Sequence, residues 1–109
     1  MGRKKYLNEA DELNCLADTL SMDSHYTPDT LSRFHALLQA RGEDDGSILL
    51  QEHWALYYAV IGNNIFSIKH YERAIELVHR LLTIGGPVGD INEEYVDGLK
   101  TKIDLLSRG

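Results

Sequence analysis

The stretch Trp54-Ala-Leu-Tyr-Tyr-Ala-Val-Ile61 decides the fold, because it is a run of apolar and aromatic side chains without a single charge. It lies inside a segment of helical character, residues 48–63, which Ser47 or Asp45 can cap and which Gly62-Asn63-Asn64 ends. A helix without a polar face has to be covered by other elements on more than one side. We therefore expect 48–63 to be the central helix and 54–61 to be the most buried segment of the chain.

Apolar residues recur at steps of three and four on both sides of this segment, which is the spacing of amphipathic helices. Thr27 and Pro28 form a start signal, since the threonine can cap free backbone N–H groups and proline fits the first helical turn. Gly42 ends that helix, Ser67 opens the fourth one, and Gly85-Gly86-Pro87 stops it. The five helices are expected at about residues 6–20, 28–41, 48–63, 67–84 and 91–107.

No segment alternates apolar and polar residues with the period of a β-strand. The sequence therefore predicts an all-α protein with a single helical domain over residues 1–109. Its helices form either a five-helix bundle or a short helical-repeat array of αα-hairpins.

The last of these helices carries a strict apolar seam. Asp90 and Glu93 resemble a capping box at its start, and Gly98 within it predicts close contact with another helix or a local bend. Such a seam can cap the chain's own hairpin, which makes residues 90–107 a capping helix, or pair with the same helix of a second copy. We expect the pairing, and hence a homodimer, with the internal cap as the alternative. The seam consists of Val96, Leu99, Ile103 and Leu106.

Composition and charge argue against several classes of function. The 109 residues carry a formal net charge of −6, so a surface that binds nucleic acid through charge alone is not expected. The longest apolar run is too short to cross a bilayer, and the single Cys15 cannot form an internal disulfide. Together these features predict a cytoplasmic domain that does not act at a membrane.

Catalytic and metal-binding patterns are missing from the sequence. The five histidines show no spacing that puts two metal ligands on one helical turn, and no Cys-x-x-Cys occurs. Cys15 has acidic neighbours, which disfavour a reactive thiolate. No glycine-rich loop ends in Lys-Ser or Lys-Thr, as a phosphate-binding loop does. We therefore expect that the protein is not an enzyme and has no catalytic residues, metal site or cofactor.

Residues 57–84 resemble a single tetratricopeptide (TPR) repeat. Ile61-Gly62-Asn63 stands where that family often has Leu-Gly-Asn, Tyr71 falls on its common tyrosine, and Ala74 falls on its small residue at the helix crossing. The glycine of this triplet and Ala74 are also the small residues that a tight crossing of two successive helices requires. The match departs from the family's usual residues at Tyr58, Lys69 and His70, and the closing proline, Pro87, comes one position late.

The resemblance implies a helical hairpin over residues 48–84 and a non-enzymatic interaction module, that is, an adaptor, chaperone or inhibitor that binds a segment of another protein. An asparagine on the ligand side of such a hairpin often binds the ligand backbone, which makes Asn63 the leading candidate. The net charge of −6 favours a partner segment of basic or amphipathic character. The protein-binding residues that the resemblance implies are Leu56, Ala59, Asn63 and Phe66.

Residues 62–77 also resemble the turn and recognition helix of a phage-repressor-type helix-turn-helix. This alternative implies a dimeric DNA-binding regulator, because one short helix alone gives little specificity. Asn63 stands where that family buries an aliphatic residue and Tyr58 where it needs a small one, so we rank the alternative second. Its expected DNA contacts are Ser67, Lys69, His70 and Arg73.

Overall fold

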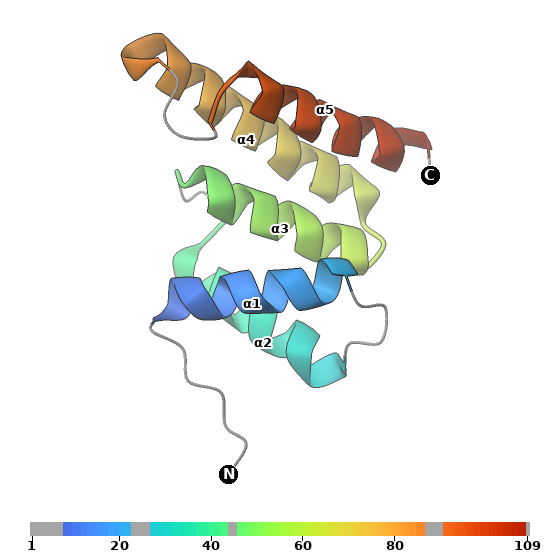
Figure 1. The fold of residues 1–109 in the computed structure, drawn as a ribbon. Helices are drawn as coiled ribbons and strands as arrows, with labels where there is room; N and C mark the ends of the chain where they lie inside the picture. Colours follow the sequence, from blue (N-terminus) through green and yellow to red (C-terminus); the bar gives the residue numbers. More distant parts are fainter. Residues whose placement is uncertain (1–7, 23–26, 44–45, 87–90, 109) are drawn as a thin grey trace.

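The structure is a computed structural model that describes residues 8–22, 27–43, 46–86 and 91–108, and helices account for most of them (Figure 1). No β-sheet occurs within these ranges, which confirms the all-α prediction. The five helices are α1 (Glu9–Met22), α2 (Pro28–Arg41), α3 (Ile48–Val60), α4 (Asn64–Gly85) and α5 (Glu93–Arg108).

The predicted signals at the ends of α2 and at the start of α3 are confirmed. The hydroxyl of Thr27 accepts a hydrogen bond from a backbone N–H in the first turn of α2, and Pro28 is the first helical residue. Gly42 follows the helix with a φ of 89°, a backbone conformation that favours glycine. Ser47 caps α3 by accepting a hydrogen bond from a backbone N–H three residues later.

The turn between α3 and α4 differs from the prediction. Helix α3 ends at Val60 and α4 begins at Asn64, because the side-chain oxygen of Asn63 accepts a hydrogen bond from the backbone N–H of Phe66 at 3.2 Å. Ser67 therefore lies inside α4 and does not open it. Gly62 has a φ of 86° and faces open space, so glycine is needed there for the turn and not for a close crossing of helices.

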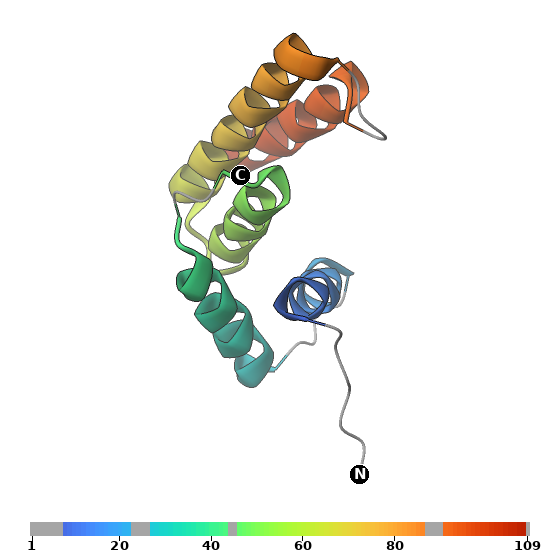
Figure 2. The same ribbon diagram turned by 90° about the vertical axis from the view of Figure 1, so that its left-hand side faces the viewer.

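The helices pack as successive hairpins. Helix α1 packs against α2, α3 packs against α4, and α3 also contacts both helices of the first pair. Helix α5 follows as a single helix that packs on α4. Figure 2 shows the resulting arc, in which α3 lies between the first pair and the α4–α5 pair, and α1 and α5 stand on the same side.

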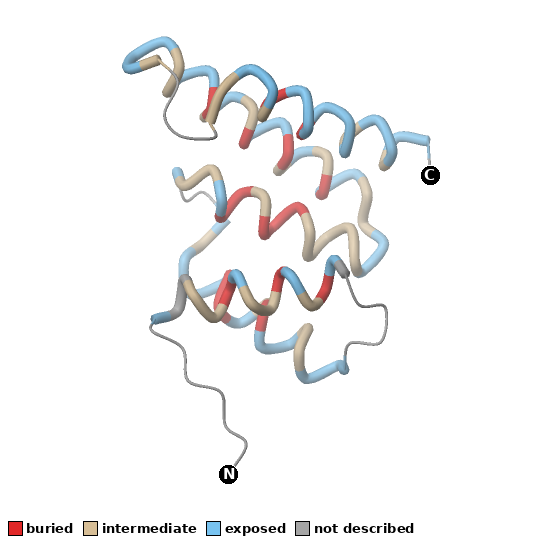
Figure 3. The backbone as a smooth tube through the Cα atoms, viewed as in Figure 1, coloured by how far each residue is buried: buried red, intermediate tan, exposed pale blue. Residues whose placement is uncertain are grey.

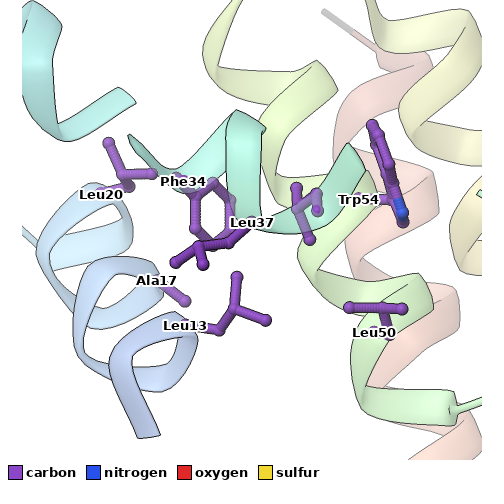
Figure 4. Packing of buried hydrophobic residues seen from close by; sticks show 8 residues of the cluster. Leu13, Ala17, Leu20, Phe34, Leu37, Leu50 and Trp54 are labelled. Carbon is purple, nitrogen blue, oxygen red and sulfur yellow. The ribbon is translucent and has the colours of Figure 1, made fainter. Parts of the chain in front are cut away.

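Two apolar clusters form the interior. The first fills the space between α1, α2 and α3, where Phe34 and Trp54 are its largest buried side chains (Figure 4). The second joins the hairpin of α3 and α4 to α5, through Ala55, Tyr71, Ala74 and Leu99. Burying these side chains supplies the main driving force for packing the hairpins on one another.

Helix α3 is central, but its most buried part lies earlier than predicted. In residues 50–55 every side chain except Glu52 is buried, whereas Leu56 to Val60 are only half-buried and Ile61 is 47% exposed (Figure 3). The prediction of 54–61 as the most buried segment is therefore wrong for 56–61. The physical reason is that α1 and α5 both flank this part of α3 without closing over it.

The apolar seam of α5 is used inside the chain. Val96 and Leu99 are buried, and Ile103 and Leu106 pack against the second apolar cluster. Gly98 faces solvent with open space around it, so the expected close contact at this glycine is wrong. The helix is capped by the side chain of Asn92, which accepts a hydrogen bond from a backbone N–H in its first turn. Asp90, the predicted cap, lies outside the described residues.

Candidate protein-binding groove

A groove of about 390 Å³ runs between α1 and α5, with α3 as its floor. The helices that line it, α1, α3 and α5, can be followed in Figure 2, where the ribbons of α1 and α5 stand on the same side of the arc. Most of its lining surface is contributed by apolar atoms. The residues that line it are Ala17, Asp18, Ser21, Leu49, Glu52, His53, Leu56, Ala59, Tyr71, Lys102, Leu105 and Leu106.

Helical spacing explains which residues of α3 reach the groove. Leu49, Glu52, Leu56 and Ala59 follow one another at steps of three and four, so they share one face of the helix. His53, next to Glu52, also lines the groove, whereas Leu50 and Trp54 belong to the cluster with α1 and α2. The apolar run that predicts a central helix thus supplies both the core and the groove.

Large apolar side chains remain exposed in the groove. Leu49 is 47% exposed on the α3 side, and Leu105 is 61% exposed on the α5 side. Leu56 and Leu106 also line it and are half-buried. Exposed apolar side chains that gather in a concave site, and not singly on a convex surface, are typical of a binding site.

Glu52 is the most buried acidic group of the groove, and its side chain is 15% exposed. One carboxylate oxygen, Oε2, accepts a hydrogen bond from the hydroxyl of Tyr95 on α5. The other oxygen, Oε1, lies 3.9 Å from Nζ of Lys102, whose side chain is 54% exposed. Burial raises the pKa of the Glu52 carboxyl above its usual value, while the Tyr95 hydroxyl and the Lys102 ammonium act in the opposite direction.

His53 connects the floor of the groove to α1. Its ring is buried, and Nε2 lies 3.2 Å from the side-chain oxygen of Asn14. Burial lowers the pKa of His53 to about 4, although the charge of nearby Asp18 acts to raise it. The ring is therefore uncharged at neutral pH, and the groove then carries the charges of Asp18, Glu52 and Lys102.

The four predicted protein-binding residues do not come together. Leu56 and Ala59 lie in the groove. Asn63 caps α4 with its side-chain oxygen, so that atom is already engaged in the fold. Phe66 is 44% exposed and lines a different hollow beside α4.

The predicted DNA-contacting residues lie beside that second hollow, except for Ser67. Ser67 is fully buried and its hydroxyl donates a hydrogen bond to the backbone of α3, so its expected role in contacting DNA is wrong. The hollow holds the cationic Lys69 and Arg73 together with three carboxylates, and Lys69 lies 5.7 Å from the centre of the Phe66 ring. Its lining residues are Glu43, Phe66, Lys69, His70, Glu72, Arg73 and Glu76.

His70 is held in place by the fold. Its Nδ1 lies 2.7 Å from the side-chain oxygen of Gln51, and its Nε2 lies 3.0 Å from a carboxylate oxygen of Glu43. The ring also stacks on Trp54 and Tyr58. These contacts join α4 to α3 and to Glu43 in the segment after α2, which gives His70 a structural role in packing.

The sequence reasoning missed the part of the groove that α1 and α5 provide. Asp18, Lys102 and Leu105 lie far from α3 in the chain, and only the packing of the hairpins brings them together. One signal was present in the sequence, since Glu52 interrupts an apolar face of α3 that is otherwise continuous from Leu49 to Ala59. A charge on such a face indicates either a paired buried group or a site.

The described residues show neither a candidate metal site nor a helix that could span a membrane. Within the described residues, no three His, Cys, Asp or Glu side chains gather in a way that could hold a metal ion. None of the described helices combines the length and the apolar character that crossing a membrane requires. The sequence matches no protein-family model, and neither a curated protein nor a solved structure gives a significant match.

Proposed function

We propose that the protein is a small non-enzymatic interaction module that binds a segment of another protein in the groove between α1 and α5. The observation that carries the proposal is the concave apolar surface over α3, with Leu49 and Leu105 exposed at it. Concave, mostly apolar sites with a few polar groups are typical of ligand binding.

The order of the helices supports this reading. The first helix of each hairpin, α1 and α3, lines the groove together with α5, whereas α2 contributes no residue to it. Helix α4 contributes only Tyr71. This alternation agrees with the expected array of αα-hairpins and with the proposed TPR-like character, in which the first helix of a hairpin faces the ligand.

The charge of the groove favours a basic or amphipathic partner. Asp18 and Glu52 provide two negative charges against the single positive charge of Lys102, and the whole chain has a net charge of −6. Complementary charge increases both the rate and the specificity of association. An adaptor, a chaperone or an inhibitor would use the groove in this way.

Matched arginine variants test the proposal. Ala59→Arg fills the groove with a long charged side chain, whereas Ala36→Arg makes the same change at an exposed position of α2. Proteins captured from a lysate of the source cells by the wild type and by Ala36→Arg, but not by Ala59→Arg, would support binding in the groove. Capture of the same proteins by all three would refute it.

The DNA-binding alternative has less support at its own surface. Lys69 and Arg73 share their hollow with Glu43, Glu72 and Glu76, so the charge there is not positive overall. Binding to phosphates requires clustered cations. We expect no retention on immobilised DNA at about 50 mM salt, and retention that Lys69→Glu abolishes would favour the alternative instead.

A further inference from the structure

Glu52 is a groove residue whose negative charge is balanced only in part. Its Oε2 is occupied by the Tyr95 hydroxyl, but Oε1 faces Lys102 Nζ at 3.9 Å, which is well beyond the length of a direct hydrogen bond. Direct bonds between a cation and a carboxylate are about 2.7–2.9 Å long. A largely buried carboxylate thus retains an oxygen at the groove that could form a shorter bond.

Lys102 can leave this position at little cost. Its side chain is about half exposed, which leaves its ammonium in reach of water. The ammonium also lies 5.7 Å from the centre of the Tyr71 ring, and a cation–π contact at such a partly exposed site is weak. At 3.9 Å, and with the lysine half exposed to water, the attraction between this ammonium and the Glu52 carboxylate is weakened. Replacing it with a closer cation is therefore favourable, provided that the new cation is positioned by other contacts.

The groove favours a helix over an extended peptide. An extended segment would bring backbone N–H and C=O groups against a mainly apolar surface, where they would lack hydrogen-bond partners. The side-chain nitrogen of His53 that lies near α1 already faces Asn14, and Glu52 is already bonded to Tyr95. A helix satisfies its own backbone and presents apolar side chains at helical spacing to the groove.

We propose that the occupant is an amphipathic helix of a partner protein, and that one of its Arg or Lys side chains binds Glu52 in place of Lys102. Apolar residues of that helix would pack between Leu56 and Leu106, and Asp18 would attract further positive charge from the α1 side. In the free protein Lys102 supplies the countercharge, which prevents a buried carboxylate from standing alone. This inference rests on the proposed function, because it names the chemistry of the ligand of the same groove.

The inference is tested with helical peptides selected from a phage-displayed library. Each peptide has a fixed amphipathic scaffold and random residues on the helix face that would contact the groove. Selection against the wild-type protein, with Ala59→Arg as the counter-selection, yields peptides that need the groove. We expect these peptides to share one Arg or Lys among apolar residues. One such peptide is then synthesised in two forms, with the basic residue intact and with it replaced by Gln.

A double-mutant cycle then tests whether the basic residue of the peptide binds Glu52. Glu52→Gln keeps an acceptor for the Tyr95 hydroxyl, and Glu72→Gln on the exposed surface of α4 is the matched control. We expect Glu52→Gln to weaken binding of the intact peptide by about tenfold and to leave the affinity for the Gln form of the peptide unchanged. Glu72→Gln should change the affinity for neither peptide. We also expect Lys102→Met to strengthen binding of the intact peptide about threefold, since it removes the competing cation.

The outcomes separate the two proposals. If no peptide survives counter-selection with Ala59→Arg, the groove does not bind helices and the inference of a helical occupant is wrong, while the proposed function is decided by the capture experiment with Ala59→Arg and Ala36→Arg. If peptides are selected but lack a basic residue, the assignment of Glu52 is wrong while the function stands. The assignment also fails if Glu52→Gln weakens both forms of the peptide equally, or if Lys102→Met leaves the affinity unchanged.

Discussion

The hydroxyl of Ser67 on α4 donates a hydrogen bond to the backbone carbonyl oxygen of Ala55 on α3 at 2.6 Å, and both residues are fully buried. Ala74, two turns further along α4, is also fully buried. Small side chains at all three positions allow the two helices to approach closely. The hairpin is therefore held by a narrow contact that combines tight packing with a polar bond between helices.

Ser67→Ala should lower the free energy of unfolding by about 1 kcal/mol, because it removes a buried hydrogen bond while changing the volume very little. Urea denaturation followed by circular dichroism measures the change. Ser32→Ala, at an exposed position of α2, is the control and should remain within about 0.5 kcal/mol of the wild type. Equal stability of the two variants would show that the bond contributes nothing.

Ala55→Asp should cost several kcal/mol, because it leaves an unpaired charge in a fully buried position. Ala59→Asp should cost only about 1 kcal/mol or less, since Ala59 is half-buried and lines the groove. The melting temperatures of the two variants, each compared with the wild type, measure these losses of stability. A larger loss for Ala59→Asp than for Ala55→Asp would mean that residues 56–61 belong to the core of α3 after all.

Most of the fold could be predicted from local signals. Thr27, Pro28, Gly42 and Ser47 act on backbone groups within one turn, so their effects do not depend on the rest of the molecule. The start of α4 was missed because both Asn63 and Ser67 are good capping residues, and packing decides between them. Ser67 turns to Ala55 and leaves the cap to Asn63.

The groove could be predicted only in part. Leu56 and Ala59 lie on one face of a helix, which the sequence shows directly. The residues that make this face a groove come from α1 and α5, and which surfaces those helices leave open depends on how the hairpins stack. Helical periodicity likewise does not distinguish the core alanine at 55 from the groove alanine at 59.

Acidification should destabilise the protein through His53. Well above pH 6.5 the ring is neutral in the folded and unfolded states alike, so its titration does not change the stability there. Below pH 6.5 the unfolded chain takes up a proton that the folded protein accepts only near its lowered pKa of about 4. The free energy of unfolding should therefore fall between pH 6.5 and 4, by up to about 3 kcal/mol for this group.

Denaturation of His53→Gln at several pH values isolates this contribution. Glutamine does not titrate and can still bond to Asn14, so the variant should lose less stability than the wild type between pH 6.5 and 4. The raised pKa of Glu52 acts in the opposite direction, but it is common to both proteins and cancels in the comparison. His79→Gln, at an exposed position, should keep the pH dependence of the wild type.

Gly98→Ala should stabilise the protein by about 0.5–1 kcal/mol, because alanine is the better helix former and its Cβ meets only open space. Gly62→Ala should have the opposite effect, since its φ of 86° is strained for any residue with a Cβ. Thermal unfolding of the two variants should show a higher melting temperature than the wild type for Gly98→Ala and a lower one for Gly62→Ala. A loss of stability for Gly98→Ala would indicate that another molecule or segment packs on that side of α5.

The state of association depends on α5. The seam that could pair two copies is engaged within the chain, where Val96 is 1% exposed and Leu99 is 2% exposed. Pairing through this seam would first require α5 to leave α3 and α4 and to expose the second apolar cluster, which opposes dimerisation by this route. Polar residues face outward instead, at Asp97, Lys100, Thr101 and Asp104.

We therefore expect light scattering at tens of micromolar to give the mass of one chain. Leu99→Asp should unfold the protein and not merely dissociate a dimer, because the charge would be buried against Ala55 and Tyr71. Lys100→Asp, on the outward face, is the control and should leave both mass and stability close to those of the wild type. A mass of two chains, reduced to one by Lys100→Asp without loss of stability, would contradict this expectation and show that the outward face of α5 forms a dimer.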